Sequence, residues 1–196
     1  MIGTSDDPVL ASVAAYSNDP VAYANQYANH LLDRPNRFAS MFSPPARILD
    51  LGCGPGRDVR IFTELGHQPT ALELNPSFIE MATPHGEVIT GDIRDIDSIF
   101  PPQTFDGVWA QASLVHLSAT ETKAVLRSLH SILTSSGHLY ACVPSVGETG
   151  WREETDGRRW YTTWPRDSFT REVADAGFTI DDVTRGAYIE VWASKP

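Results

Sequence analysis

A glycine-rich segment is the first part of the chain whose residue types and spacing could do chemistry. It reads Asp50-Leu51-Gly52-Cys53-Gly54-Pro55-Gly56 and follows the short apolar run 46–51. Glycines let the backbone adopt positive φ and pass close to a ligand. The spacing G-x-G-x-G differs from the G-x-G-x-x-G that seats a pyrophosphate on a helix N-terminus. Because the acidic Asp50 also stands where phosphates would lie, the segment predicts a loop that holds a ligand without phosphate.

Acidic residues follow two further apolar runs. Glu73 ends the second run, 23 residues after Asp50, and Asp92 with Ile93 follows the third. A carboxylate can accept both hydroxyls of a ribose at the first place and an adenine amino group at the second, while Ile93 can cover one face of the base. In an open α/β sheet, ligands bind at the carboxyl ends of the strands. The ordered set therefore predicts an adenosine site.

The elements that must position these residues alternate along the chain. Apolar runs predict strands at 46–51, 68–74, 86–90, 105–110, 137–143, 179–184 and 188–193; helical spacing predicts helices at 57–65, 75–83, 95–100, 119–133 and 167–176. Such alternation indicates an α/β fold with a mostly parallel sheet and helices on both faces. A hairpin-length turn at Arg185-Gly186 makes the last strand antiparallel.

The segment before the first expected strand is less regular. Residues 1–16 are expected to be a loose leader without the features of a signal peptide. Residues 17–42 show helical spacing that breaks at Pro35, so two short helices are expected there, ending at Pro44-Pro45.

Composition bounds the function classes. The chain has 196 residues, is 41% hydrophobic and carries a net charge of −10, which fits one domain with a real core and disfavours nucleic acid or an anionic membrane as partner. Two cysteines, Cys53 and Cys142, form no metal-ligand or disulfide pattern, so we expect no metal, a reducing compartment and a cytoplasmic location. No run of 18 apolar residues occurs that would predict a membrane span.

With these residues in view, the chain resembles the class I S-adenosylmethionine-dependent methyltransferases, in their small single-domain form (types 11, 12 and 25). DLGCGPGRD (50–58) is the most specific part of a resemblance that runs from about Tyr16 to the C-terminus. It implies one domain, 1–196, with a Rossmann-like, doubly wound, seven-stranded core at 44–196. It further implies an N-terminal helical lid at 1–43, a substrate lid at 144–165, S-adenosylmethionine as cofactor and S-adenosylhomocysteine as product.

The resemblance also implies the cofactor contacts. The glycine loop would hold the methionine portion, Glu73 the ribose, Asp92 with Ile93 the adenine, and the backbone at Ala110-Gln111 the sulfonium region. The full implied set is Tyr16, Tyr23, Asp50, Gly52, Cys53, Gly54, Gly56, Arg57, Glu73, Leu74, Asp92, Ile93, Ala110 and Gln111. Tyr16 and Tyr23 would belong to a helix that closes over the cofactor; their alternative is a role in helix packing alone.

Two segments are expected to meet the acceptor. Gln111–His116 follows the fourth expected strand, and relatives often carry a histidine at the position of His116. An imidazole there can orient the acceptor or remove its proton; the open alternative is a structural histidine that caps the long helix. Residues 144–165 form a connection long enough to be a functional lid. The expected substrate contacts are Ser113, His116, Trp151, Arg158, Trp160 and Tyr161.

The lid composition suggests a kind of acceptor. Arginine forks onto carboxylates, and aromatic faces stabilise a nearby sulfonium or amine, so a small planar or carboxylate-bearing molecule is expected. The alternative is that the aromatics only close the lid. Thr162-Thr163 stand where the resembling segment usually has two tyrosines. The acceptor atom (N, O, S or C) is left open.

Other functions remain as alternatives. Asn75-Pro76-Ser77-Phe78 is similar to the N-P-P-F/Y motif of nitrogen methylation, but it follows the second expected strand instead of the fourth, which argues against nucleobase or glutamine methylation. A non-catalytic protein that binds S-adenosylmethionine or S-adenosylhomocysteine is the first alternative, and an NAD-dependent oxidoreductase is a weaker one. A monomer or a homodimer is expected.

Overall fold

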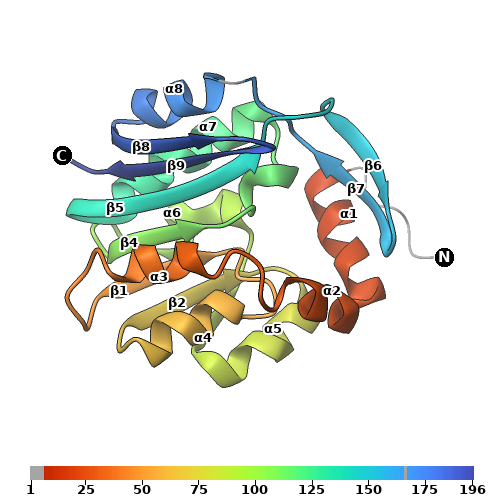
Figure 1. Ribbon diagram of the computed structural model, residues 1–196, viewed down its shortest axis with the longest axis horizontal. Helices are drawn as coiled ribbons and strands as arrows, with labels where there is room; N and C mark the ends of the chain where they lie inside the picture. Colours follow the sequence, from red (N-terminus) through yellow and green to blue (C-terminus); the bar gives the residue numbers. More distant parts are fainter. Residues whose placement is uncertain (1–6, 166) are drawn as a thin grey trace.

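A seven-stranded sheet forms the centre of the computed structural model, which describes residues 7–165 and 167–196 (Figure 1). Its strand order is β3-β2-β1-β4-β5-β9-β8. The strands are β1 (Arg47–Leu51), β2 (Gln68–Glu73), β3 (Glu87–Thr90), β4 (Phe105–Ala110), β5 (Leu133–Pro144), β8 (Thr179–Arg185) and β9 (Tyr188–Ser194). Strands β1 to β5 pair in parallel, whereas β9 runs antiparallel to both β5 and β8. The expected Rossmann-like α/β sheet with an antiparallel last strand is confirmed.

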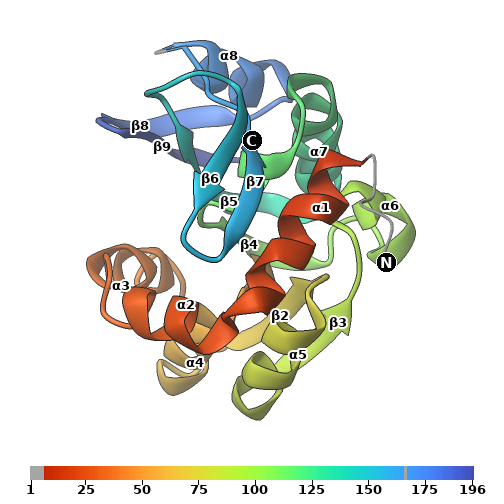
Figure 2. The same ribbon diagram turned by 90° about the vertical axis from the view of Figure 1, so that its right-hand side faces the viewer.

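Helices cover both faces of this sheet. They are α1 (Pro8–Ala15), α2 (Pro20–Tyr27), α3 (Asp33–Ala39), α4 (Arg57–Glu64), α5 (Pro76–Ala82), α6 (Ile96–Ile99), α7 (Ala119–Ile132) and α8 (Ser168–Asp175). Helices α3, α4 and α5 lie on one side, and α6, α7 and α8 lie on the other (Figures 1 and 2). The fold is therefore doubly wound.

The buried strands pack against both helical layers because alternate side chains point to opposite faces. Leu49 and Leu51 of β1 join the core beneath α6, α7 and α8. Ile48 joins a second, more aromatic core, in which Trp109 stacks on Tyr140 with ring centroids 4.2 Å apart. Asp50 is two residues after Ile48 in the same strand, so its side chain points to the same face of the sheet, the side of α3 and α4.

Local signals in the sequence explain where helices begin. The side chain of Asn75 accepts hydrogen bonds from the backbone N–H groups of Ser77 and Phe78, with Pro76 in the first helical position of α5. Ser118 and Glu121 form a capping box at the start of α7.

Three expectations about the chain's elements are wrong. Residues 8–15 form α1 instead of a loose leader, because Asp7 caps the helix and Val9 is buried against the core; residues 1–6 lie outside the described residues. Pro35 lies in the first turn of α3, where a missing N–H costs nothing, so the break falls at 28–32. Strand β5 begins at Leu133, because that residue already pairs with Phe105 before a bulge.

The long connection 144–165 contains a two-stranded antiparallel hairpin, β6 (Gly150–Glu154) and β7 (Gly157–Tyr161). The hairpin and α1 lie together over the carboxyl ends of the parallel strands (Figure 2). Ser12 in α1 accepts a 2.8 Å hydrogen bond from the backbone N–H of Trp160. A Cβ on Gly157 would lie 3.1 Å from Cβ of Ala15, so the hairpin backbone packs closely against the helix.

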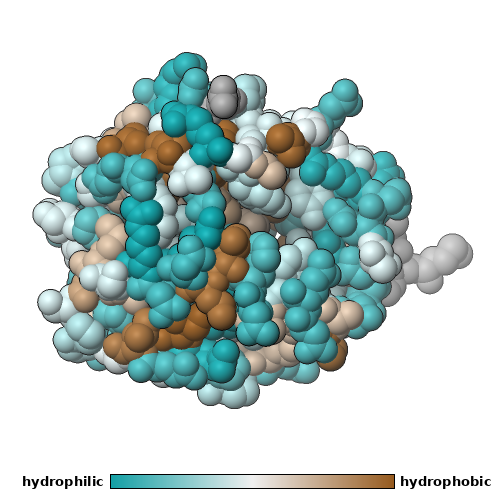
Figure 3. Space-filling model, viewed as in Figure 1, coloured by the Kyte–Doolittle hydropathy of each residue, from teal (hydrophilic) through white to brown (hydrophobic). Residues whose placement is uncertain are grey.

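The face seen in Figure 3 is mostly hydrophilic, and its hydrophobic residues form separate narrow strips. Among the helices of the described residues, none combines the length and the hydrophobicity required to traverse a bilayer.

Candidate functional site

The glycine loop after β1 has the backbone that its sequence predicts. Gly52 and Gly54 have φ of +66° and +55°, values that favour glycine. A Cβ on Gly52 would lie 2.7 Å from Cβ of Ser113, which only a glycine avoids. A Cβ on Gly54 would meet nothing within 4 Å, because this backbone borders a cavity. The loop therefore leaves space for a ligand directly against the main chain.

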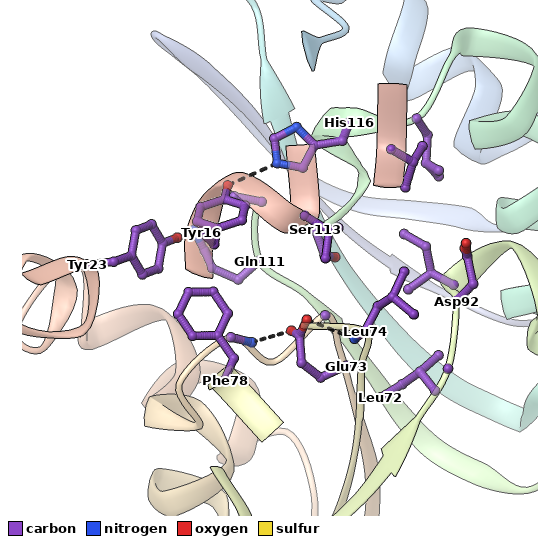
Figure 4. A pocket seen from close by; sticks show the side chains of 18 residues that line it. Tyr16, Tyr23, Leu72, Glu73, Leu74, Phe78, Asp92, Gln111, Ser113 and His116 are labelled. Atoms are coloured by element: carbon purple, nitrogen blue, oxygen red, sulfur yellow. Dashed lines mark hydrogen bonds between the residues drawn. The ribbon is translucent and has the colours of Figure 1, made fainter. Parts of the chain in front are cut away.

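Glu73 ends β2 and faces this loop. Its carboxylate accepts hydrogen bonds of 2.8 Å each from the backbone N–H groups of Gly54, Leu74 and Asn75 (Figure 4). Burial raises the pKa of Glu73, and these three donors act in the opposite direction. A carboxylate offers about four lone-pair sites, so Glu73 retains capacity for a hydroxyl donor.

Asp92 and Ile93 follow β3 on the other side of the same cavity (Figure 4). Both oxygens of Asp92 accept from the guanidinium of Arg94, at 2.6 to 3.0 Å. Arg94 also donates to Asp7 and Glu121. Arg94 thus ties Asp92 to the residues that cap α1 and α7.

Asp50 is the innermost carboxylate of the site. It is 3% exposed, and its Oδ2 atom has no hydrogen-bond partner among residues 7–165 and 167–196. Burial, followed by the negative charge of Asp58, raises the pKa of Asp50 well above its usual range. Asp58 itself is held by Arg57 and by a 2.8 Å hydrogen bond from the indole N–H of Trp109. A cationic group bound in the cavity would stabilise the charged form of Asp50.

Tyr16 and His116 make a direct contact above the cavity, with Oη and Nε2 2.9 Å apart (Figure 4). The Nδ1 atom of His116 is bonded to the backbone carbonyl oxygen of Trp160. Because a carbonyl only accepts, Nδ1 carries the proton, and Nε2 then accepts from the Tyr16 hydroxyl. Burial lowers the pKa of His116 to about 4. The imidazole is therefore neutral near pH 7, with both nitrogens engaged.

Two adjoining cavities make up the site. The first lies between α1, the glycine loop and the ends of β2 and β3. The second, about 720 Å³, extends from the same loop toward the hairpin and the ends of β5 and β9. Tyr16, Tyr23, Gly52, Gly54 and Gln111 border both cavities. One ligand can therefore pass from the first cavity into the second along the glycine loop.

Most of the expected site residues border these cavities. The first cavity has Tyr16, Tyr23, Gly52, Gly54, Glu73, Leu74, Asp92, Ile93, Gln111, Ser113 and His116 in its wall; the second adds Asp50, Cys53, Arg57 and Tyr161. Gly56 instead packs against Ala82, where a Cβ would come within 2.6 Å of the backbone. Ala110 is fully buried in the core.

Three expected substrate residues do not border either cavity. Trp151 is opposite Trp160 and Arg158 is opposite Glu153, on the hairpin face that does not carry Arg152 and Arg159. Arg158 lies over the ring of Trp151, 4.7 Å from its centroid, and the arginine side chain is 58% exposed.

Several wall residues were missed from the sequence. Val9 and Val13 of α1 border the first cavity, and Arg152, Glu154 and Arg159 border the second. Successive side chains of a strand point to opposite faces. This alternation in 150–161 could have placed Arg152 and Arg159 on one face of the hairpin and Arg158 on the other. The valines could have been found from the Asp7-Pro8 helix start.

The site contains no evident metal centre: in residues 7–165 and 167–196, no three His, Cys, Asp or Glu side chains are grouped so that they could hold an ion. The orphaned Asp50 oxygen, the open space before Gly54 and the unpartnered buried oxygens of Gln111 and Ser113 instead fit an organic ligand with several polar groups.

Comparison with known proteins agrees with this geometry. Residues 48–137 match the model of a methyltransferase domain family. That span contains the glycine loop, Glu73 and Asp92, within the sheet order described above. Over these residues the chain is similar to a methyltransferase domain.

Curated proteins similar to this chain include the ubiquinone biosynthesis O-methyltransferase of Xanthomonas axonopodis pv. citri. The two are 30% identical over 101 residues, which is 48% of this chain and 41% of the relative. The chain thus matches about two fifths of that relative's length, and the match does not extend to the whole protein.

Solved structures show the same methyltransferase fold. The 1,6-didemethyltoxoflavin-N1-methyltransferase of Burkholderia thailandensis, solved with 1,6-didemethyltoxoflavin and S-adenosylhomocysteine, has a TM-score of 0.74 and 22% identity over 92% of this chain and 84% of that one. The [4+2]-cyclase SpnF has a TM-score of 0.67 and 18% identity over 84% of this chain and 80% of that one. Because a cyclase shares the fold, activity has to be argued from the site.

Proposed function

We propose that this protein transfers a methyl group from S-adenosylmethionine to a small planar acceptor. The observation that carries the proposal is the convergence of Asp50, Glu73 and Asp92, from the ends of three adjacent parallel strands, around a glycine loop with open space before Gly54. The family match supports the cofactor assignment.

The two cavities suggest how the cofactor would lie. Asp92 and Ile93 would hold the adenine, Glu73 the ribose, and the backbone of Gly52 and Gly54 the methionine portion. Bound S-adenosylmethionine supplies a methyl group on a sulfonium, which passes to a lone pair of the acceptor as the S–CH₃ bond breaks and S-adenosylhomocysteine forms. The cationic sulfonium and ammonium groups would complement Asp50, whose oxygen has no partner.

The acceptor would occupy the cleft under the hairpin. Its wall contains six tyrosine side chains, which suit a planar molecule; they are Tyr16, Tyr23, Tyr27, Tyr140, Tyr161 and Tyr188. The walls would orient the acceptor toward the methyl group and exclude water, which is the protein's main contribution to such a transfer.

The role proposed for His116 depends on its hydrogen bond with Tyr16. Nε2 of His116 accepts from the Tyr16 hydroxyl, and Tyr16 borders both cavities whereas His116 borders only the first. We assign Tyr16 to acceptor or cofactor contact and His116 to positioning of Tyr16. The sequence-based alternative, His116 as a base that removes the acceptor's proton, is less favoured because its buried imidazole has a pKa lowered to about 4.

Cofactor binding is tested by calorimetric titration with S-adenosylhomocysteine, with NAD as the competing ligand class. The wild type is expected to bind S-adenosylhomocysteine in the micromolar range and NAD not at all. Glu73→Ala should abolish measurable binding, whereas Glu87→Ala, at the far end of the neighbouring strand, should not change it. NAD binding, or S-adenosylhomocysteine binding unaffected by Glu73→Ala, would refute the assignment.

Turnover separates the enzyme from a non-catalytic binding protein. If the protein binds S-adenosylhomocysteine and yet releases none from S-adenosylmethionine with any member of a broad panel of phenols, aromatic amines, heterocycles and thiols, the non-catalytic alternative is favoured. A cytoplasmic location and a monomeric or homodimeric state stay predictions.

A further inference from the structure

The two faces of the β6–β7 hairpin differ in what they carry. In an antiparallel pair, directly opposed residues share a face. Arg152 is opposite Arg159, and Gly150 is opposite Tyr161. The side chains of Arg152, Arg159 and Tyr161 border the wide cleft, as does Glu154. Two guanidinium groups therefore stand side by side on the surface of the hairpin that covers the acceptor region.

Arg159 is the more deeply placed of the two. The residue is 4% exposed, and its Cζ lies 3.8 Å from the centroid of the Tyr16 ring. Its carboxylate partner is Asp156 in the hairpin turn, while its Nε atom is buried without a hydrogen-bond partner in the part of the chain that the structure describes. A buried, unpartnered donor on a charged group is costly unless a ligand satisfies it.

Arg152 has no carboxylate partner within salt-bridge distance in the described part of the chain. Its Nη2 atom donates to Oγ1 of Thr163 at 2.8 Å and to the carbonyl of Glu148 at 3.2 Å. Its Cζ lies 4.8 Å from the ring centroid of Tyr161. These contacts fix the guanidinium in place and leave its charge uncompensated.

The other charges of the cleft do not neutralise this pair. Arg34 is bonded to Glu190 through two nitrogens, and Arg57 is bonded to Asp58 in the same way. Glu154 shares the hairpin face, but it makes no ion pair with either guanidinium among the described residues. Of the two guanidinium groups of the hairpin, Arg159 is therefore paired with Asp156 in the turn, whereas Arg152 has no ion-pair partner in the described part of the chain.

From this placement we propose that Arg152 and Arg159 form an anion-binding subsite, so that the acceptor carries a carboxylate or another ionised oxygen on its planar ring. The inference deepens the proposed function and rests on it. Arginine forks bind carboxylates through paired hydrogen bonds, and the neighbouring Tyr16 and Tyr161 rings can pack against the ring that bears the charge. The subsite lies on the lid, so an anionic acceptor would also help to hold the lid closed.

Three probes that share a phenol ring and carry an anionic, a neutral or a cationic para substituent test the subsite. Protein saturated with S-adenosylhomocysteine is titrated calorimetrically with 4-hydroxybenzoate, methyl 4-hydroxybenzoate and 4-hydroxybenzylamine. The anion is expected to bind about tenfold or more tightly than the neutral ester, with the amine weakest, because hydrogen bonds between two charged groups are stronger than those to a neutral group. Equal binding of acid and ester, tighter binding of the amine, or no binding of any probe would overturn the proposal.

Matched arginine variants locate the subsite. Arg152→Gln should weaken 4-hydroxybenzoate binding about tenfold or more and leave the ester unchanged, and Arg152→Lys should recover part of the loss. Arg158→Gln, on the opposite face of the same hairpin, should change neither. Equal losses in Arg158→Gln and Arg152→Gln would contradict the assignment. Failure of the wild type to bind S-adenosylhomocysteine would instead refute the proposed function, so the two failures are distinguishable.

Discussion

At the scale of single residues, the site depends on buried polar groups with unusual protonation. His116 lies between two oxygens that belong to different elements, Tyr16 in the N-terminal region and the carbonyl of Trp160 in the hairpin. The neutral imidazole ring of His116 forms a hydrogen bond with each of these two oxygens. A protonated ring would carry a second N–H toward the Tyr16 hydroxyl and a charge in a buried place, which costs free energy.

This arrangement predicts an acid-sensitive fold. The pKa of His116 is lowered by burial from 6.5 to about 4, so the unfolded state binds the proton more readily. Stability is therefore complete above about pH 6.5 and is lost as the pH falls toward 4, by about 3 kcal/mol at pH 4 from this group. In urea unfolding at pH 7 and pH 4, His116→Gln should show a correspondingly smaller loss than the wild type. An exposed control, His30→Gln, should follow the wild type; equal losses in all three proteins would contradict the prediction.

Asp50 provides another case, a carboxyl group whose charged form is disfavoured by burial and by Asp58 in the folded protein. Because burial and Asp58 raise its pKa, the charged form destabilises the folded state at pH 7. Asp50→Asn should raise the stability of the free protein by about 1 kcal/mol or more, or about 2–4 °C in Tm. The same change should weaken S-adenosylmethionine binding. Differential scanning calorimetry and titration measure the two effects; a variant less stable than the wild type would contradict the argument.

At the scale of elements, α1 depends on contacts beyond its own sequence. Arg94 joins the N-cap residue of α1, Asp7, to Asp92 and Glu121. Asn75 donates to the carbonyl of Val13 near the other end of the helix. The helix is only two turns long, and so short a helix depends on such tertiary contacts.

Removal of the Arg94 side chain is therefore expected to loosen α1. Arg94→Met should increase amide hydrogen exchange in residues 8–15 and weaken S-adenosylhomocysteine binding by about tenfold or less, because partly exposed pairs contribute modestly. Arg60→Met, which removes an exposed pair with Glu64 in α4, serves as the control. Unchanged exchange in 8–15 would show that Arg94 does not hold the helix.

The elements also show what the sequence could and could not predict. The strands and helices from 46 to 133 were predicted to within a few residues, because buried strands, Asn75 and the glycine loop leave local signals. Helix α1 was missed because it is short and its stability comes from Asp7, Arg94 and the hairpin, far apart in sequence. The orientation of the lid residues was missed because it depends on strand pairing in 150–161, which a loop assignment does not include.

At the scale of the whole molecule, the cofactor should act as part of the fold. Its proposed site joins α1 to the ends of the hydrogen-bonded strands β1, β2 and β3. Near this site, α1 is tied to the segment after β2 by the hydrogen bond from Asn75 to Val13. A ligand that binds only the folded state stabilises it by about 2.7 kcal/mol at 100 times its Kd. For a chain of this size we expect S-adenosylhomocysteine at that concentration to raise Tm by about 5–10 °C. A differential scanning measurement with adenosine as control checks this; no shift at saturating ligand would contradict it.

The hairpin lies over α1, and α1 lies over the first cavity, so this arrangement affects the order in which ligands bind and leave. Strand β7 packs on α1 through Trp160 and Gly157, and α1 in turn covers the first cavity with Val9 and Val13. An acceptor bound by the hairpin would hold the hairpin against α1. Helix α1 would then prevent the cofactor from entering or leaving the first cavity. Turnover is accordingly expected to follow a compulsory order, in which the cofactor enters before the acceptor and the methylated product departs before S-adenosylhomocysteine.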